Sequence, residues 1–382
     1  MEKRVQLTGR KILFAFGVLL ISALFITSIQ LIGAGFQHLG SNLADSIFSA
    51  TSNPFIGLFI GLLVTAILQS SSTTTTMAVA LVASGSLPLE HAVPIVIGAN
   101  IGTTLTSTLV SLSYITRKNE FVRAFSAGIV HDLFNISVAL LIFPLELRYQ
   151  FLSKTSHYLA QLFPVSEGSF FIRGIDRLFQ PIAISTVNSL GALFTILLGL
   201  VLLFTSVKVV SQLLYKQWVN RSANLDGAFR NRFRVFGFGL LTTSVIQSSS
   251  LMTSLMVPLV ATGKISLKRA FAFIIGTNLG TTVTAILAAI FKSEVALSLA
   301  FAHFIFNLIG CILFLSIPYL FNGITKLATQ LGVITLRYRT LGIAYVMFTF
   351  FIFPFTLIYL SQFPDSRLVK KDRIETTAQK AH

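Results

Sequence analysis

One polar stretch occurs twice in this chain, and its residues are better suited to holding ions than to breaking bonds. It reads Gln-Ser-Ser-Ser at residues 69–72 and again at 247–250. The copies lie 178 residues apart, and residues 69–109 match 247–287 at 20 of 41 positions without a gap. This identity indicates an internal duplication.

A second motif accompanies each copy. The sequence Gly-x-Asn-x-Gly-Thr-Thr starts at Gly98 and again at Gly276, at the same 178-residue spacing. Hydroxyl and amide side chains can donate and accept hydrogen bonds without carrying a charge. A single Ser or Thr in a membrane helix often only bonds back to its own backbone. The doubled motifs as units favour a shared site, whereas the glycines could serve helix packing alone.

The acids and bases needed for enzymatic chemistry are missing around these motifs. Segment 54–112 has one acid, Glu90, and segment 236–291 has none. Neither segment offers a nucleophile with a base or a cluster of metal ligands. We therefore expect no enzyme and no cofactor. A site without a fixed charge can bury an anion when a cation such as Na⁺ binds beside it, so Na⁺ is the expected coupling ion.

The spacing of the hydroxyls suggests how they would be presented. On a continuous helix, Gln69, Ser72, Thr73 and Thr76 would share one face. In the second copy, the matching face would carry Gln247, Ser250 and Ser254. Two such faces would enclose a polar chamber.

The composition specifies the environment of the motifs. The chain has 382 residues, of which 54% are hydrophobic and 11% charged, and its mean hydropathy is +0.80. Several apolar runs reach the roughly 20 residues needed to cross a bilayer. We predict an all-α polytopic membrane protein. The net charge of +16 lies in short loops and at the ends, as the positive-inside rule predicts, which argues against nucleic-acid binding.

The repeats predict the domain organisation. Seven consecutive hydroxyl residues, 70–76, would face lipid on a plain helix, so we expect broken or re-entrant helices there. Loop charges place the start of the first repeat inside and that of the second outside, which predicts an inverted pair of the kind found in secondary transporters. The predicted segments are 1–11, a cytoplasmic N-terminus; 12–145, transmembrane repeat 1; 146–189, an extracytoplasmic linker with an amphipathic segment; 190–320, transmembrane repeat 2; 321–362, a connecting segment and the last transmembrane helix; and 363–382, a polar tail. The resulting count of crossings puts the basic tail outside, contrary to the charge rule, and suggests a miscounted element near 320–345.

A buried acid and several amides form a second set of candidates. His131, Asp132 and Asn135 lie in one apolar run, and Asn307 lies in the corresponding run of the second copy. An ionisable residue inside a membrane is a functional candidate by default. Asp132 has no acidic counterpart in the second copy, so a structural tether and a role in ion coupling stay open.

These motifs resemble those of the type II sodium-dependent phosphate cotransporters. The resemblance rests on both Gln-Ser-Ser-Ser and both Gly-x-Asn-x-Gly-Thr-Thr stretches, together with residues 119–125 and the Val-His-Asp-Leu-Phe-Asn of 130–135. It covers about residues 12–320. It implies Na⁺-coupled uptake of inorganic phosphate by alternating access. A bacterial member is indicated because segment 146–180 has no Cys and no glycosylation sequon, which implies a multi-pass protein of a bacterial inner membrane with a cytoplasmic N-terminus.

The resemblance, together with the motif positions, implies two overlapping sets of site residues. Phosphate would be bound by Ser70, Ser71, Ser72, Thr73, Asn100, Ser248, Ser249, Ser250 and Asn278. Sodium would be bound by Gln69, Thr103, Thr104, Gln247, Ser248, Ser249, Thr253, Thr281 and Thr282. The expected partners are phosphate, sodium ions and the lipid bilayer. The alternatives are a Na⁺-coupled carrier of another small anion such as a dicarboxylate, which should offer a fixed Arg, and a non-transporting membrane sensor or scaffold, which should carry a soluble domain.

Overall fold

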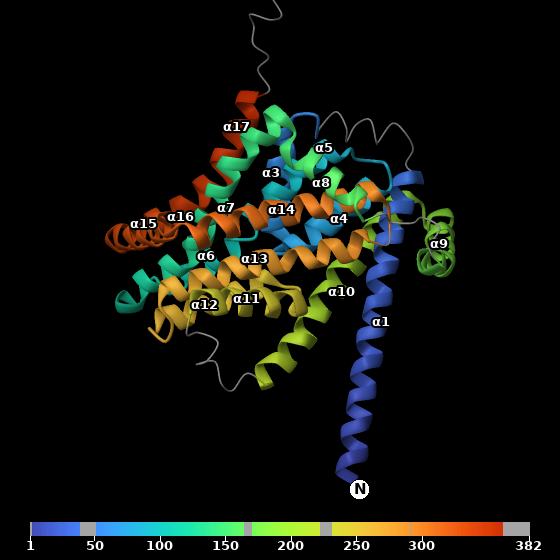
Figure 1. The fold of residues 1–382 in the computed structure, drawn as a ribbon, viewed down its shortest axis with the longest axis horizontal. Helices are drawn as coiled ribbons and strands as arrows, with labels where there is room; N and C mark the ends of the chain where they lie inside the picture. The colour runs from blue at the N-terminus through green and yellow to red at the C-terminus, as the bar shows by residue number, and fades with distance from the viewer. Residues whose placement is uncertain (1, 39–50, 164–169, 222–230, 291, 362–382) are drawn as a thin grey trace, which may run out of the picture.

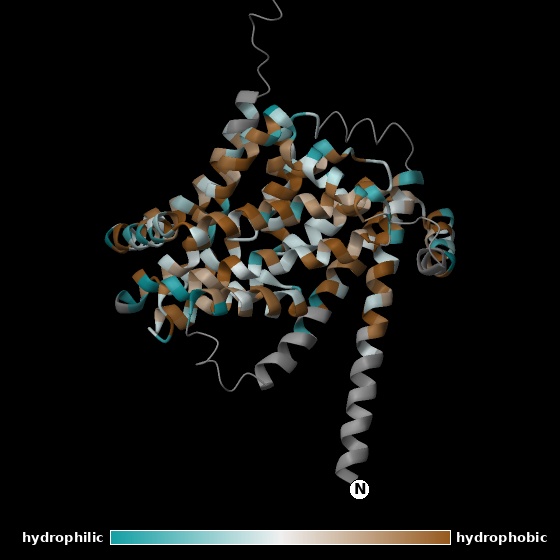
Figure 2. Cartoon of the chain, viewed as in Figure 1, coloured by the Kyte–Doolittle hydropathy of each residue, from teal (hydrophilic) through white to brown (hydrophobic). Residues whose placement is uncertain are grey.

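Helices make up all the regular secondary structure in the described part of the chain. The computed structural model describes residues 2–38, 51–163, 170–221, 231–290 and 292–361. The predicted polar tail, 363–382, lies outside these residues. Within these described residues, six helices are long and apolar enough to cross a membrane, and hydrophobic residues predominate on most helices in Figure 2. The prediction of an all-α polytopic membrane protein is confirmed.

The first Gln-Ser-Ser-Ser lies where one apolar helix ends and another begins. Helix α3 (Pro54–Leu68) starts with Pro at its first position and with Asn53 as its cap, whose side chain accepts a hydrogen bond from the Phe55 N–H at 3.0 Å. Helix α4 (Ser71–Ala83) follows after only two residues. The break expected near the hydroxyl-rich run is confirmed: it lies at Gln69 and Ser70, and the hydroxyls of 71–76 are on the continuous helix α4.

The second copy folds in the same way. Helix α11 (Arg232–Ile246) ends before Gln247, and α12 (Ser249–Ala261) begins after Ser248. Both short pairs then lead into the second motif. In the first copy it lies on α5 (Leu89–Gly102), which α6 (Leu105–Leu112) continues, and in the second it lies on α13 (Leu267–Ala289). The order of elements is therefore duplicated along with the sequence.

Glycines at matching positions bring helices into close contact in both copies. A Cβ built on Gly98 would overlap the carbonyl oxygen of Leu58, and one built on Gly276 would overlap that of Phe236. Gly61 and Gly239 meet the facing backbone in the same manner. The glycines therefore do serve packing: they allow α5 to lie against α3, and α13 against α11, at backbone contact distance.

Two long helices carry the His and Asn residues of the second candidate set. Helix α7 (Lys118–Tyr149) contains His131, Asp132 and Asn135, and α14 (Glu294–Ser316) contains His303 and Asn307. Both cross the middle of the molecule in Figure 1, beside α13. They place polar side chains from both repeats in one buried layer.

One long helix from each predicted repeat packs antiparallel against the other. Helix α1 (Glu2–His38) packs against α10 (Ala192–Arg221), with Gly35 beside Ile196 and Gly199 beside Ile32. Because the residue numbers run in opposite directions, the N-terminus of α1 and the C-terminus of α10 lie at the same end, as Figure 1 also shows.

The remaining helices lie at the periphery. They are α8 (Phe151–Gln161), α9 (Phe170–Leu190), α15 (Pro318–Arg337), α16 (Thr340–Met347), the π-helix η1 (Phe348–Ile352) and α17 (Phe353–Ser361). Helix α15 is not among the six candidate spans. It occupies most of the region where the count of crossings conflicted with the charge rule.

Two glycines on α11 provide a matched test of the close packing. Gly239→Ala should lower the stability by about 1–3 kcal/mol, because the new methyl group would overlap the Phe273 carbonyl oxygen. Gly237→Ala should be neutral or raise stability by up to about 1 kcal/mol, since nothing lies within 4 Å of its Cβ and Ala favours a helix. Thermal unfolding of both purified variants in detergent measures the difference. Equal melting temperatures would contradict close packing at Gly239.

Candidate functional site

Each Gln-Ser-Ser-Ser begins with a glutamine in the left-handed backbone conformation. Gln69 has φ 54° and ψ 31°, and Gln247 has φ 59° and ψ 26°. Their N–H groups close the preceding helices by donating to Thr65 O at 2.7 Å and to Thr243 O at 2.6 Å. Residues other than Gly and Asn seldom adopt this conformation, and such strain is concentrated at functional sites.

This turn corrects one sequence-based prediction. A continuous helix would have placed Gln69 on one face with Ser72, Thr73 and Thr76. The helix instead ends at Leu68 and restarts at Ser71, so Gln69 does not share a helical face with the hydroxyls that follow. The same holds for Gln247 in the second copy.

The two breaks bind each other across the repeats. Ser250 Oγ donates to the carbonyl oxygen of Gln69 at 3.0 Å, and Ser72 Oγ donates to that of Gln247 at 3.4 Å. The two bonds are reciprocal, which is the relation expected of two copies around a local two-fold axis. They place the beginnings of α4 and α12 side by side.

Both new helices begin with a serine cap. The Ser70 side chain accepts from the Thr73 N–H at 3.3 Å, and the Ser248 side chain accepts from the Leu251 N–H at 3.4 Å. The first N–H groups of a helix lack partners within it, and its N-terminal end carries a partial positive charge. Two such ends directed at a common space favour an anion.

A cavity of about 290 Å³ lies at this junction. Its polar wall combines hydroxyl and amide side chains from both repeats with one cation from α10. It is lined by Leu68, Gln69, Ser70, Thr73, Thr106, Phe204, Val207, Lys208, Gln212, Ser248, Ser250, Leu251 and Ser254. Five of the predicted site residues are thus brought together here, from α4, α12 and the turns before them.

Other predicted residues lie on the same elements without lining this cavity. Ser71, Ser72, Ser249 and Thr253 are buried on α4 and α12. The hydroxyls of Ser71 and Ser249 make no hydrogen bond within the described part of the chain, so both can accept a ligand.

The threonines of the second motif bond to their own helices. Thr103 and Thr104 donate to Ala99 O at 2.9 Å and Ile101 O at 2.7 Å. Thr281 and Thr282 do the same with Thr277 O at 2.8 Å and Leu279 O at 2.7 Å. Their oxygens keep lone pairs that could coordinate a cation.

Several buried hydroxyls have no partner among the described residues, and sequence analysis missed most of them. Thr65 of the first repeat is not one of them, because its hydroxyl donates to Thr74 Oγ1 at 2.8 Å. Its counterpart Thr243 faces no such group, because Met252 takes the place of Thr74. The unpartnered buried threonine hydroxyls are those of Thr75, Thr76, Thr106, Thr243 and Thr284. The pairing of Thr106 with Thr284 at the repeat spacing was a signal available in the sequence.

Asn100 and Asn278 have a different setting from the serines. Asn278 Oδ1 accepts from His131 Nε2 at 2.6 Å, and its Nδ2 donates to Asn135 Oδ1 at 2.5 Å. Asn100 Oδ1 lies 3.3 Å from His303 Nε2 and accepts from Asn307 Nδ2 at 3.1 Å. Each motif asparagine therefore meets a His–Asn pair of the other repeat, and neither lines the 290 Å³ cavity.

Asp132 lies apart from that network. Its Oδ2 accepts from Thr108 Oγ1 at 2.8 Å and from the Tyr345 hydroxyl at 3.1 Å, while Oδ1 has no partner among the described residues. The carboxylate is fully buried. It ties α7 to α6 and α16 through a Thr and a Tyr hydroxyl, whereas the tether considered from the sequence was an Asp–His or Asp–Arg pair. The unpartnered oxygen leaves ion coupling open.

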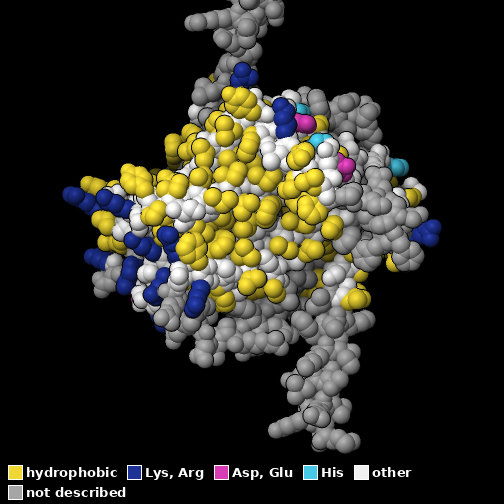
Figure 3. Space-filling view, in the orientation of Figure 1, with side chains coloured by type: hydrophobic (Ala, Val, Ile, Leu, Met, Phe, Trp, Pro, Cys, Tyr) yellow, Lys and Arg dark blue, Asp and Glu magenta, His cyan; other side chains and the backbone are white. Residues whose placement is uncertain are grey.

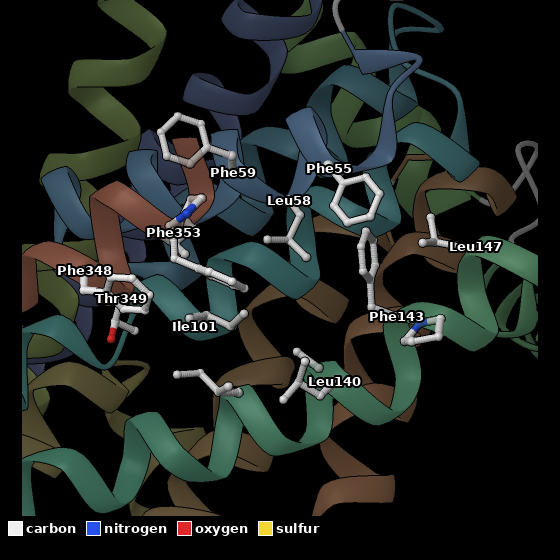
Figure 4. A pocket seen from close by; sticks show the side chains of 15 residues that line it. Phe55, Leu58, Phe59, Ile101, Leu140, Phe143, Leu147, Phe348, Thr349 and Phe353 are labelled. Atoms are coloured by element: carbon white, nitrogen blue, oxygen red, sulfur yellow. The ribbon is translucent and has the colours of Figure 1, made fainter. Parts of the chain in front are cut away.

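A larger cavity of about 460 Å³ does not suit ions. Phenylalanine and aliphatic side chains of α3, α7 and the η1–α17 region surround it, and Thr349 is the only hydroxyl on its wall (Figure 4). Burying a phosphate or Na⁺ against such a wall would leave it without ligands. Within the described ranges, no group of three or more His, Cys, Asp and Glu side chains could hold a metal ion.

Comparison with known proteins identifies relatives. The family model described as Na⁺/Pi-cotransporter matches residues 24–164 and again 202–342. The chain is 29% identical to human sodium-dependent phosphate transport protein 2B over 439 residues, covering 88% of this chain and 64% of that protein. It is 30% identical to mouse protein 2A over 437 residues, covering 93% of this chain and 68% of that protein. No solved structure is similar enough to count as a match.

Removal of Asn278 should separate a structural from a ligand-binding role. Asn278→Ala removes the acceptor of His131 Nε2 and the donor to Asn135 Oδ1, and leaves Nε2 only the Asn135 side-chain nitrogen at 3.2 Å. Stability should therefore fall by about 2 kcal/mol or more. Thermal unfolding measures this, with Thr262→Ala as control, because Thr262 is exposed and bonds only within its own helix. An unchanged melting temperature with weakened phosphate binding would instead place the amide on the ion.

Proposed function

The chain belongs to the Na⁺/Pi-cotransporter family, and on this premise we propose that it carries inorganic phosphate into the cell together with Na⁺. The chain spans 64% of the length of the human 2B protein, so transport by this chain rests on its own site. The observation that supports it is the crossed pair of hydrogen bonds, which brings two helix N-termini and two sets of serines to one cavity. The family and the relatives are transporters, which points away from an enzymatic activity.

We assign phosphate to the beginnings of α4 and α12. Ser70, Ser71 and Thr73 from the first repeat, and Ser248 and Ser249 from the second, would supply hydroxyl donors there. Ser72 and Ser250 belong to the same site, but in this arrangement their hydroxyls donate to the carbonyl oxygens of Gln247 and Gln69. The unpaired N–H groups of both first turns add further donors. Such donors can satisfy the oxygens of a bound oxyanion without an acidic or basic side chain among these residues.

We assign sodium to oxygens at the end of the helix that precedes each break and on the helix that carries the second motif. Na⁺ is a hard cation that prefers several oxygen ligands. Carbonyl groups at the end of α11 and the buried hydroxyls of Thr243, Thr253, Thr281 and Thr284 offer such oxygens. Gln247 would contribute its amide, and Gln69, Thr103 and Thr104 are the corresponding groups of the first repeat. We expect Na⁺ as coupling ion and no resident cofactor.

The proposed orientation has the N-terminus in the cytoplasm of a bacterial inner membrane. In Figure 3 an apolar band crosses the face shown, most Lys and Arg side chains gather at its left and lower left, and the acidic residues and most His lie at the upper right. This separation of charge supports a cytoplasmic lower-left end. In this orientation the first repeat would start on the cytoplasmic side and the second on the opposite side, so the two would be inverted. During alternating access the repeats would move relative to each other around the crossed hydrogen bonds of Ser72 and Ser250.

Uptake into proteoliposomes tests the function directly. Purified protein should accumulate radiolabelled phosphate only with an inward Na⁺ gradient, because burying the anion requires the cation. Arsenate should compete and succinate should not, which separates phosphate from the dicarboxylate alternative. Equal uptake with K⁺ in place of Na⁺ would contradict Na⁺ coupling, and the absence of any uptake would favour a non-transporting protein.

Ser71 and Ser249 provide the sharpest test of the assigned site. Ser71→Ala and Ser249→Ala should each lower phosphate affinity by about ten- to a hundredfold, since a hydrogen bond to a charged group contributes about 1.5–3 kcal/mol. Their stability should not change, because neither hydroxyl bonds to the described part of the protein. Exposed Ser113, which donates only to its own helix, is the control position. Normal transport by both variants would move the site elsewhere.

A further inference from the structure

We propose that Lys208 of α10 is the phosphate-attracting charge of this transporter, positioned at the mouth of the hydroxyl-lined cavity. The inference rests on the proposed function and adds a residue from outside both repeat motifs. Sequence analysis predicted a site without any fixed charge. In the folded protein a fixed charge from outside the motif segments does reach the cavity, since Lys208 lines it together with Ser70 and Ser248.

The setting of Lys208 keeps its ammonium group at the cavity wall. The Nζ atom lies 5.4 Å from the centre of the Phe204 ring, and that ring also lines the cavity. A cation over an aromatic face is held by the ring's quadrupole. Lys208 makes no ion pair with any described residue, so its charge is not neutralised by a neighbouring acid.

The cavity wall contains no opposing charge. Apart from Lys208, its members are hydroxyl, amide and apolar residues, and none is acidic. The positive ends of α4 and α12 have the same sign as the lysine. All the charges and helix dipoles named here are therefore positive, which favours an anion at this wall, and low-dielectric walls focus the field of a single charge.

The fold also specifies which face Lys208 serves. Lys208 lies just past the middle of α10 and next to the C-terminal limit of its apolar span, Ala192–Val209. Because α1 and α10 are antiparallel, this limit of the span is directed toward the end of the pair where α1 begins. Lys208 is exposed, so the cavity reaches the surface at this end. In the proposed orientation this is the cytoplasmic mouth, where phosphate leaves the site during uptake and binds it during exchange.

Equilibrium binding of radiolabelled phosphate to the purified full chain in Na⁺ tests the assignment. Lys208→Gln should weaken binding about three- to tenfold, as expected for the loss of one nearby charge at a wet surface. Lys208→Arg, which keeps the charge, should bind within about twofold of the wild type. Lys264→Gln is the matched control, since Lys264 is also exposed but lies beyond the far end of α12.

Salt dependence separates charge from shape. Raising the ionic strength with choline chloride at constant Na⁺ should weaken phosphate binding by the wild type and by Lys208→Arg, and should affect Lys208→Gln much less. A purely structural role would leave the three salt dependences alike. This measurement on the wild type and Lys208→Arg stands even if Lys208→Gln folds poorly.

The outcomes distinguish this inference from the proposed function. If Lys208→Gln binds phosphate as tightly as the wild type at low salt, the role of Lys208 is overturned, and the proposed phosphate transport is unaffected. A wild type that binds no phosphate in Na⁺ overturns both. Weakened binding by Lys208→Gln, rescue by Lys208→Arg and normal binding by Lys264→Gln together establish the lysine as the attracting charge.

Discussion

The structure depends on how two broken helices satisfy their backbone inside a membrane. A helix end buried away from water leaves carbonyl groups without partners, and each unpaired group is costly in hydrocarbon. At Gln69 and Gln247 the left-handed turn closes the preceding helix, and the carbonyl oxygen of each glutamine accepts a hydroxyl from the opposite repeat. Without the opposite repeat, neither glutamine carbonyl oxygen would have this hydroxyl partner. The duplication therefore supplies each half with the partner that makes its break tolerable.

The same backbone carries different side chains in the two copies. Matching glycines bring α5 against α3 and α13 against α11, so both hairpins have the same frame. In the first copy Thr65 and Thr74 satisfy each other. In the second, Met252 leaves the Thr243 hydroxyl without a partner among the described residues. A buried polar atom without a partner is unfavourable unless a ligand completes it, so the asymmetry distinguishes the oxygens of the two halves.

The sequence predicted features that are local or repeated, and it missed those that require three dimensions. The hydroxyl run from Ser70 to Thr76 correctly predicted a broken helix, because no lipid-exposed helix can present it. The shared face of Gln69 and Ser72 was wrong, since a helical wheel cannot show a left-handed residue. Asn100 and Asn278 were interpreted as lining the site because nothing in their spacing reveals the His–Asn pairs that meet them. Helix α11 separates Lys208 from the second Gln-Ser-Ser-Ser in the sequence, and only the packing of α10 brings Lys208 to the cavity.

The presence of Lys208 changes the argument for Na⁺ coupling without removing it. An exposed lysine at the mouth attracts an anion over roughly a Debye length, but solvent screens its charge for a phosphate that has moved inward. Ser71 and Ser249 are buried, and their own helices carry no charged residue. Phosphate bound there meets only dipoles and hydroxyls, which offset part of the cost of burying its charge. A cation bound beside it would supply the rest. The fixed charge of Lys208 would attract phosphate to the mouth, and the bound Na⁺ would offset the cost of burying it. A lysine fixed deeper in the site would keep the anion bound after Na⁺ had left, which would slow its release.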